Sequence, residues 1–193
     1  MVFNGSDIRE MVKTSVRKVL NESIVDDVVK NFDNEVNRVC SDINEYLSQF
    51  GIRAKFNKRY DFSSQYSDAV AIYQRRSVVK DGCMRFSINL EAMKNFAEMA
   101  DEDEFLSYED VSKQIDLSLW HECGHGLIEW IKKQRRNDTQ QKTGIFKGEK
   151  LKALRWLLGY EEEDLVEEFA EQMVFHDTHS DLLEFINDYM IPQ

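Results

Sequence analysis

Two histidines four residues apart, His121 and His125, form the pattern HExxH with Glu122 between them. On an α-helix this spacing places both imidazoles on one face, one turn apart, where they can share a metal ion. Glu122 can then take a proton from a metal-activated water. The uncharged residues around the motif suit a buried helix and favour neutral imidazoles, which zinc binding requires. We therefore predict a site for one zinc ion (Zn2+) per chain, with Glu122 as its general base.

A zinc site of this kind needs a third protein ligand, and the chain has only two other histidines, His176 and His179. Seven acidic residues crowd residues 161–171, downstream of the motif. Among them, Glu167 and Glu171 lie one helical turn apart on the flank of an apolar face. The residues alone leave these third ligands open: Glu167, Glu168, Glu163, a histidine or a cysteine.

The HExxH motif and the acidic helix after it resemble the gluzincins, the thermolysin-like clan of zinc peptidases. In that clan a glutamate on a second helix is the third ligand, and an acidic residue four positions later supports the first motif histidine. The resemblance implies Glu167 as ligand and Glu171 as the supporting carboxylate, with Ala170 as the small residue between them. It covers residues 24–190 in the order of elements, and it looks most like the compact ImmA/IrrE-type members of phages and mobile elements. It implies an intracellular zinc metalloendopeptidase with a narrow range of protein substrates.

The family's transition-state histidine or tyrosine has no obvious counterpart in this chain. His176 and His179 follow the acidic helix, and one of them could reach the cleft and stabilise an oxyanion. The other interpretation is that both are ordinary loop histidines. The segment 132–150 carries seven Lys or Arg against two acids. Two interpretations of this segment also remain: a lid that grips the substrate, or a solvated loop.

Two other functions are compatible with the motif. The protein could be a virion or regulatory interaction protein whose zincin domain binds a partner without turnover, although the intact base Glu122 argues against this. A metal amidase similar to the peptide deformylases would use the cysteine of a Gly-Cys pair, here Cys83, as its third ligand. The glycine-rich segment near the start of that family is missing, which argues against the second function.

The composition is that of a globular chain with one domain: 193 residues, 42% of them hydrophobic and 32% charged. The formal net charge of −11 argues against nucleic acid or an anionic membrane as a partner. No apolar run approaches the roughly 18 residues of a membrane span, and the first residues lack a signal-peptide pattern. Three unpaired cysteines are typical of a reducing compartment: Cys40, Cys83 and Cys123. We therefore expect a cytoplasmic protein, virus- or phage-encoded if the resemblance holds, that acts on a protein or peptide.

The chain divides near its start. Residues 7–20 have the pattern of a basic amphipathic helix, and residues 21–23 interrupt it. We therefore expect an appendage at 1–22 and a metallopeptidase domain at 23–193. Residues 7–50 could also bind a protein partner or a second copy of the chain.

A helix predicted for 24–50 carries a heptad seam of apolar residues and ends at Gly51. Alternation with period two then predicts three strands, at 52–57, 68–79 and 84–90. Asp81-Gly82 predicts a hairpin turn between the last two strands, and we expect the last strand to form the edge of the cleft. Five helices follow, with a loop at 134–147: 91–100, 107–133, 148–158, 161–176 and 179–189. These elements predict an α+β, zincin-like fold with a long N-terminal helix, a small antiparallel or mixed three-stranded sheet, and a helical subdomain that carries the zinc.

Overall fold

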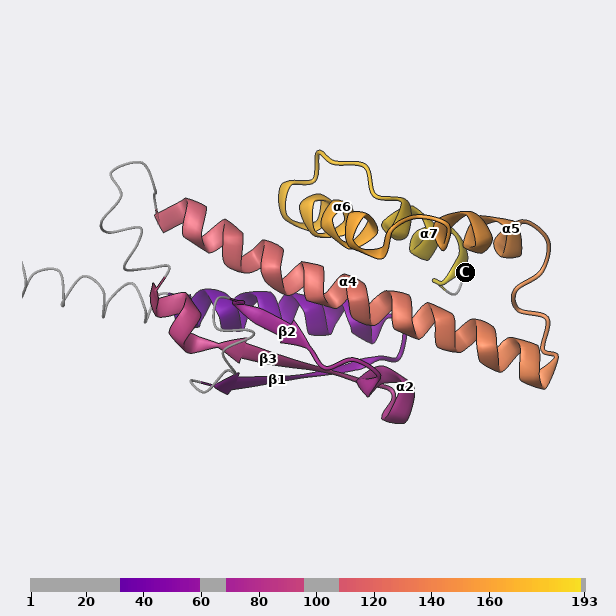
Figure 1. The fold of residues 1–193 in the computed structure, drawn as a ribbon, viewed down its shortest axis with the longest axis horizontal. Helices are drawn as coiled ribbons and strands as arrows, with labels where there is room; N and C mark the ends of the chain where they lie inside the picture. Colours follow the sequence, from indigo (N-terminus) through magenta and orange to yellow (C-terminus); the bar gives the residue numbers. More distant parts are fainter. Residues whose placement is uncertain (1–31, 60–68, 96–107, 192–193) are drawn as a thin grey trace, which may run out of the picture.

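The computed structural model describes residues 32–59, 69–95 and 108–191. The predicted appendage at 1–22 lies outside these residues. The fold is mixed α and β, mostly helical with a small three-stranded sheet, as the periodicity predicts (Figure 1). In chain order the elements are helical residues 32–48, β1 (Arg53–Arg59), β2 (Ala71–Tyr73), α2 (Ser77–Asp81), β3 (Cys83–Asn89), helical residues 90–95, α4 (Tyr108–Gln141), α5 (Gly148–Leu157), α6 (Glu162–Phe175) and α7 (Asp181–Tyr189).

The helix at 32–48 buries its predicted heptad seam in the core. Phe32, Val36, Val39 and Ile43 are each at most 1% exposed. The helix ends where Gly51 adopts the left-handed conformation, with φ +67°, as the sequence predicts for a glycine after a helix. These residues of the seam therefore pack against other elements of the same chain.

The sheet is mixed, with strand order β1-β3-β2. β1 pairs in parallel with β3, from Arg53 opposite Cys83 to Arg59 opposite Asn89. β2 pairs with β3 in the antiparallel direction. The prediction that the third strand forms the cleft edge is wrong, because β3 has a neighbour on both sides and β2 is the edge strand. Alternation identifies strands but not their order in the sheet. Here β1 and β3 are parallel neighbours, although β2 lies between them in the sequence.

The connection between β2 and β3 also differs from the prediction. The two strands are adjacent and antiparallel, but the short helix α2 joins them in place of a tight hairpin. Gly82 has φ +69° and ends α2, and its N–H donates to the Val78 carbonyl at 3.1 Å. An Asp-Gly pair marks a left-handed residue in either setting, since hairpin turns and helix ends both need one.

The helix α4 has 34 residues and runs eight residues further than predicted, through the expected loop at 134–147 to Gln141. The added stretch has no glycine or proline and contains several strong helix formers, so nothing in it stops the helix. The backbone turns at Lys142 and Gly144, which both have positive φ. The helices α5, α6 and α7 lie within two residues of their predicted bounds.

The basic segment 132–150 is therefore ten residues of helix followed by a short connection to α5. Asp138 holds this connection against α4, because its carboxylate accepts the N–H groups of Ile145 and Phe146 at 2.7 and 3.0 Å. The carboxylate also accepts the Thr143 hydroxyl. Such anchoring favours a fixed loop over a mobile lid.

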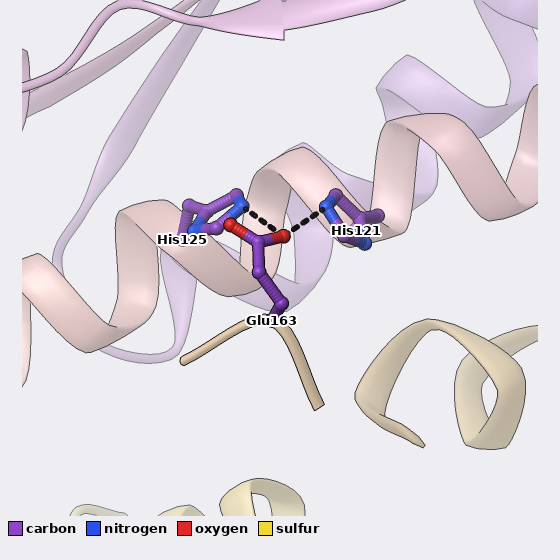
Figure 2. A group of neighbouring side chains, drawn as sticks. All are labelled: His121, His125 and Glu163. Carbon is purple, nitrogen blue, oxygen red and sulfur yellow. Dashed lines mark ion pairs between the residues drawn. The ribbon is translucent and has the colours of Figure 1, made fainter. Parts of the chain in front are cut away.

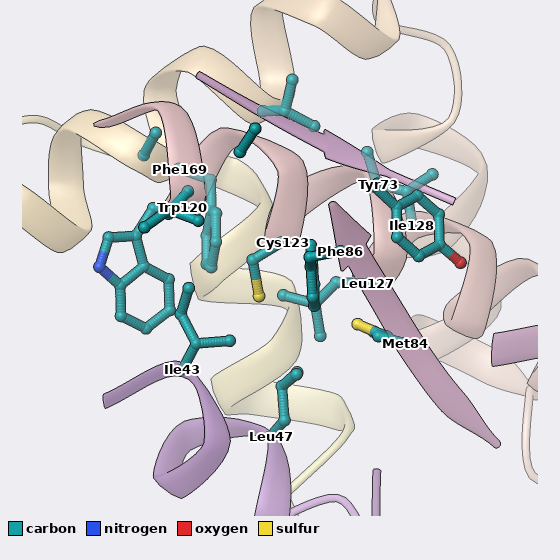
Figure 3. Packing of buried hydrophobic residues seen from close by; sticks show 14 of the residues in the cluster. Ile43, Leu47, Tyr73, Met84, Phe86, Trp120, Cys123, Leu127, Ile128 and Phe169 are labelled. Carbon is teal, nitrogen blue, oxygen red and sulfur yellow. The ribbon is translucent and has the colours of Figure 1, made fainter. Parts of the chain in front are cut away.

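The helix α4 is the centre of the molecule, with the sheet and helix 32–48 on one side and α5, α6 and α7 on the other (Figure 1). Its inner residues are fully buried: Leu119, Cys123, Leu127, Ile128 and Ile131. Figure 3 shows three of them, Cys123, Leu127 and Ile128, between the sheet and α6. Tyr46 packs edge-on against Trp120, which packs edge-on against Phe169 of α6. Packing on both sides fixes the direction in which the side chains of α4 point. None of the helices within the described residues has both the length and the apolarity needed to cross a lipid bilayer.

Candidate metal centre

His121 and His125 lie on the face of α4 that is turned toward α6, as their spacing predicts (Figure 2). Their ring centroids are 4.9 Å apart. His125 is 9% exposed, and the side chain of His121 retains 26% of its accessible surface. The pair is thus partly enclosed but still reachable from solvent, as a catalytic metal site requires.

Glu163, in the first turn of α6, completes a group with the two histidines (Figure 2). One carboxylate oxygen, Oε2, lies 3.4 Å from Nε2 of His121 and 3.6 Å from Nε2 of His125. The three potential ligand atoms all lie within 4.8 Å of one another. Two imidazole nitrogens and one carboxylate oxygen are a donor set that zinc accepts in catalytic sites.

A second glutamate, Glu162, contacts His125 at Nδ1, on the side of the imidazole opposite Glu163. Its Oε1 lies 3.0 Å from Nδ1 of His125, and its Oε2 accepts from Nζ of Lys132 at 2.8 Å. A neutral imidazole that donates from Nδ1 leaves the lone pair of Nε2 free toward Glu163. Burial alone would raise the pKa of Glu162, but Lys132 and His125 outweigh it and lower that pKa. An ionised Glu162 favours the tautomer of His125 with its proton on Nδ1, which leaves Nε2 able to bind a metal.

The protonation of His121 also suits metal binding. Burial is the main cause that lowers its pKa, and the neighbouring His125 lowers it further. Glu163 and Glu167 act in the opposite direction and only partly offset this. A lowered pKa means that protons compete less well with a metal for the imidazole.

Glu122 points from α4 to the edge strand. Its Oε2 accepts the backbone N–H of Tyr73 at 2.5 Å. Burial raises the pKa of Glu122, and the Tyr73 N–H opposes the shift only in part. A carboxylate with a raised pKa is a better proton acceptor near neutral pH than an ordinary surface glutamate.

Glu129 fastens the same strand two turns further along α4. Its Oε2 accepts the Tyr73 hydroxyl at 2.9 Å and the Arg76 N–H at 2.7 Å. The hydroxyl of Tyr73 is thus turned toward Glu129. Together, Glu122 and Glu129 hold the start of the β2–α2 connection against the motif helix.

The structure groups Glu163 with the histidines, whereas the resemblance implies Glu167. Glu167 and Glu171 instead line a neighbouring pocket, beside His121 and Glu122. Glu171 forms no hydrogen bond with either histidine, because it lies two turns beyond Glu163, or about 12 Å along the helix axis. All three glutamates share one face of α6, so the sequence alone does not fix which turn lies level with His121.

The remaining candidates lie outside this group. His179 forms a separate exposed group with Asp181 and Glu184 at the start of α7, and its Nε2 lies 2.9 Å from the Asp181 carboxylate. His176 is the exposed residue that ends α6, with φ +62°. Neither histidine lines the pocket beside His121. Cys83 is 1% exposed at the start of β3 and belongs to neither potential metal group in the described residues.

Two glycines in and next to the motif set the distance of α4 from its neighbours. A Cβ on Gly124 would lie 2.9 Å from Cγ1 of Val166 on α6, and a Cβ on Gly126 would lie 2.6 Å from Sδ of Met84 on β3. Both partners are fully buried. Gly124 thereby lets α6 approach closely enough for Glu163 to reach the histidines.

We expect Gly124→Ala to push α6 outward, lowering both the melting temperature and the zinc affinity. Overpacking costs about 1–3 kcal/mol, which exceeds the gain of up to about 1 kcal/mol from replacing a helical glycine by alanine. Thermal unfolding and zinc titration measure the two effects. Gly126→Ala is the matched control, because it displaces the flexible Met84 and not α6. Equal zinc affinity of both variants and the wild type would contradict a spacing role for Gly124.

Sequence reasoning missed Glu162, Lys132 and Tyr73 as neighbours of the motif. Glu162 and Lys132 are charged residues among many in their segments, and no spacing signal links residues 30 positions apart. Comparison with protein-family models, with curated proteins and with solved structures gives no match to this chain. The geometry of the site therefore carries what can be inferred about function.

Proposed function

We propose that this protein is a zinc-dependent metallopeptidase of the gluzincin type, with a zincin-like fold. His121, His125 and Glu163 would hold the metal, and Glu122 would act as the general base. The observation that carries the proposal is the convergence of one Glu163 oxygen on Nε2 of both motif histidines. A glutamate beside them with a raised pKa supplies the proton acceptor that hydrolysis needs.

The group fits a metal better than it fits an ion pair. A salt bridge to Glu163 would require a protonated histidine, and the lowered pKa of His121 opposes that. His125 already has a carboxylate partner for Nδ1 in Glu162, so its Nε2 is the atom left to bind a ligand. Zinc binds neutral imidazole, so the lowered pKa of His121 favours a metal at this position.

The four-residue spacing of the gluzincin pattern also fits Glu163 and Glu167, one turn earlier on α6 than the sequence alone implies. Glu163 would then be the ligand, and Glu167 would be the acidic residue that supports the first motif histidine. Glu167 is near enough to His121 to act on its pKa. Glu171 is left without a role at the metal.

The chain's own residues can carry the hydrolysis of a peptide bond. A zinc ion bound here would supply Lewis acidity to the substrate carbonyl and to the attacking water. Glu122 accepts the proton of that water and passes it to the leaving amine. Its contact with the Tyr73 N–H keeps the carboxylate directed at the edge of β2, next to the histidines.

The edge strand can hold an extended substrate. Val70 and Gln74 use their backbone groups to pair with β3, as shown by the bonds from Asn89 N–H to Val70 and from Gln74 N–H to Arg85. By alternation, Ala71 and Tyr73 turn theirs away from β3, where the Tyr73 N–H is already bound to Glu122. A peptide that pairs with Ala71 would run alongside His121 and Glu122, which line the same pocket as Ala71.

The first test is the metal content. We expect the purified full-length chain, loaded with zinc and desalted, to retain about one equivalent by mass spectrometry of the metal. His121→Ala and His125→Ala should each lose it, whereas His176→Ala should keep it. Retention of well under one equivalent by the wild type, without chelators, would reject the proposal. A bound metal without cleavage of any peptide would favour the non-catalytic interaction protein.

A further inference from the structure

A pocket of about 390 Å³ opens beside His121 and Glu122, between the edge of β2, the first half of α4, and α6. Its size falls within the roughly 300–1,000 Å³ of ordinary ligand sites. Small and apolar residues form most of its lining, including Ala71, Leu117, Ser118 and Ala170. A side chain that enters here therefore meets little steric obstruction.

The charged residues that line this pocket are all acidic. Three of the lining residues are glutamates, Glu122, Glu167 and Glu171, and the described lining includes no lysine or arginine. Neither Glu167 nor Glu171 forms an ion pair with a residue in the described part of the chain, and both are exposed. A metal held by Glu163 and the two histidines would offset the negative charge of the glutamates closest to it. Glu171, however, lies about 12 Å beyond Glu163 along the axis of α6. The negative charge at that end of the pocket thus lacks a partner within the described chain.

We propose that this pocket selects a basic side chain of the substrate, arginine above lysine, next to the bond that is cleaved. This inference rests on the proposed peptidase function and names the substrate class of the same site. Glu167 and Glu171 are four residues apart on one helix, so their side chains lie roughly 5–6 Å apart at Cβ. Two carboxylates at that spacing can each accept from one edge of a planar guanidinium, whereas a lysine ammonium has no such fixed fork.

Direct binding tests the pocket independently of turnover. The probes are N-acetyl-arginine methylamide and its citrulline analogue, which has nearly the same shape without the charge. In nitrogen-15 NMR titrations of the full chain, we expect the arginine probe to bind at least about fivefold more tightly. The shifts should centre on Ala71, Ser118 and Ala170. Equal binding of the two probes would overturn the proposal.

Glu171→Gln should reduce the preference for arginine severalfold, and Glu171→Lys should abolish it. Glu168→Gln is the matched control: this residue lies in the same helix, but its carboxyl lies near Asp181 and His179 and not in the pocket. We expect it to leave the preference unchanged. An equal loss in Glu168→Gln would show that the overall charge of the protein, and not the pocket, attracts the arginine probe.

Cleavage of a randomised peptide pool separates this inference from the proposed function. Products enriched in arginine or lysine at one position beside the cleaved bond, with the enrichment lost in Glu171→Gln, would support both. Cleavage without such enrichment would support the peptidase and overturn the selectivity of the pocket. Absence of cleavage together with preferential arginine binding would retain the pocket as a site for basic groups and reject the peptidase.

Discussion

Glu122→Gln is expected to abolish peptide hydrolysis while the protein stays folded and keeps its zinc. The amide fills the same space and can still accept the Tyr73 N–H through its oxygen, but it cannot take a proton from water. Loss of a general base typically costs 10²- to 10⁴-fold in rate, so about a thousandfold decrease in kcat is expected. Cleavage rates on a confirmed peptide, metal content and the melting temperature measure the three parts of this prediction.

The control for this variant is Glu129→Gln. Glu129 also lies on α4 and also accepts an N–H from the β2–α2 connection, at Arg76, but it lies two turns beyond Glu122 and outside the motif. If Glu122 acts only by fastening the strand, both variants should lose activity to a similar extent. Unchanged cleavage by Glu122→Gln would exclude it as the base.

The pH profile of the wild type should carry the same signature. Burial raises the pKa of Glu122, so its carboxylate becomes available as a base only at a higher pH than an ordinary glutamate. Activity should therefore fall as the pH drops through this raised pKa. Reading kcat against pH in the zinc-loaded enzyme separates this loss from loss of the metal.

The sequence alone was sufficient for the elements that depend on local spacing. The HExxH pattern predicts two imidazoles on one helical face, and His121 and His125 lie there. The heptad seam predicts the buried face of helix 32–48, because apolar periodicity is the direct cause of that burial. In the same way, three helices after residue 147 follow from amphipathic runs between obvious breaks.

Long-range order was beyond the sequence. Strand order depends on how β3 pairs with β1, which no local pattern encodes. Which of Glu163, Glu167 and Glu171 lies level with the histidines depends on how α6 packs on α4, where Gly124 meets Val166. Each of these glutamates satisfies the same local pattern, so only the packing of two helices distinguishes them.

The choice among these glutamates leads to the second large effect. Glu163→Ala should lower the zinc affinity by more than about 100-fold, since it would remove one of three protein ligands. Loss of a residue that only supports a ligand typically costs about 10- to 100-fold in affinity. Glu162→Ala and Glu167→Ala should fall within that lower range, because these residues would act on His125 and His121. Competitive titration against a chromophoric chelator gives the affinities.

Glu168→Ala serves as the matched control for this series, because it removes an equal charge from the same helix on the side of Asp181. Its zinc affinity should equal that of the wild type. The opposite order of zinc affinities, lowest for Glu167→Ala and nearly that of the wild type for Glu163→Ala, would mean that α6 binds the metal one turn beyond Glu163. The contact between Gly124 and Val166 would then have to shift by a turn of the helix, about 5.4 Å. Gly124→Ala would in that case leave zinc binding unchanged, so the two experiments together fix which turn of α6 holds the metal.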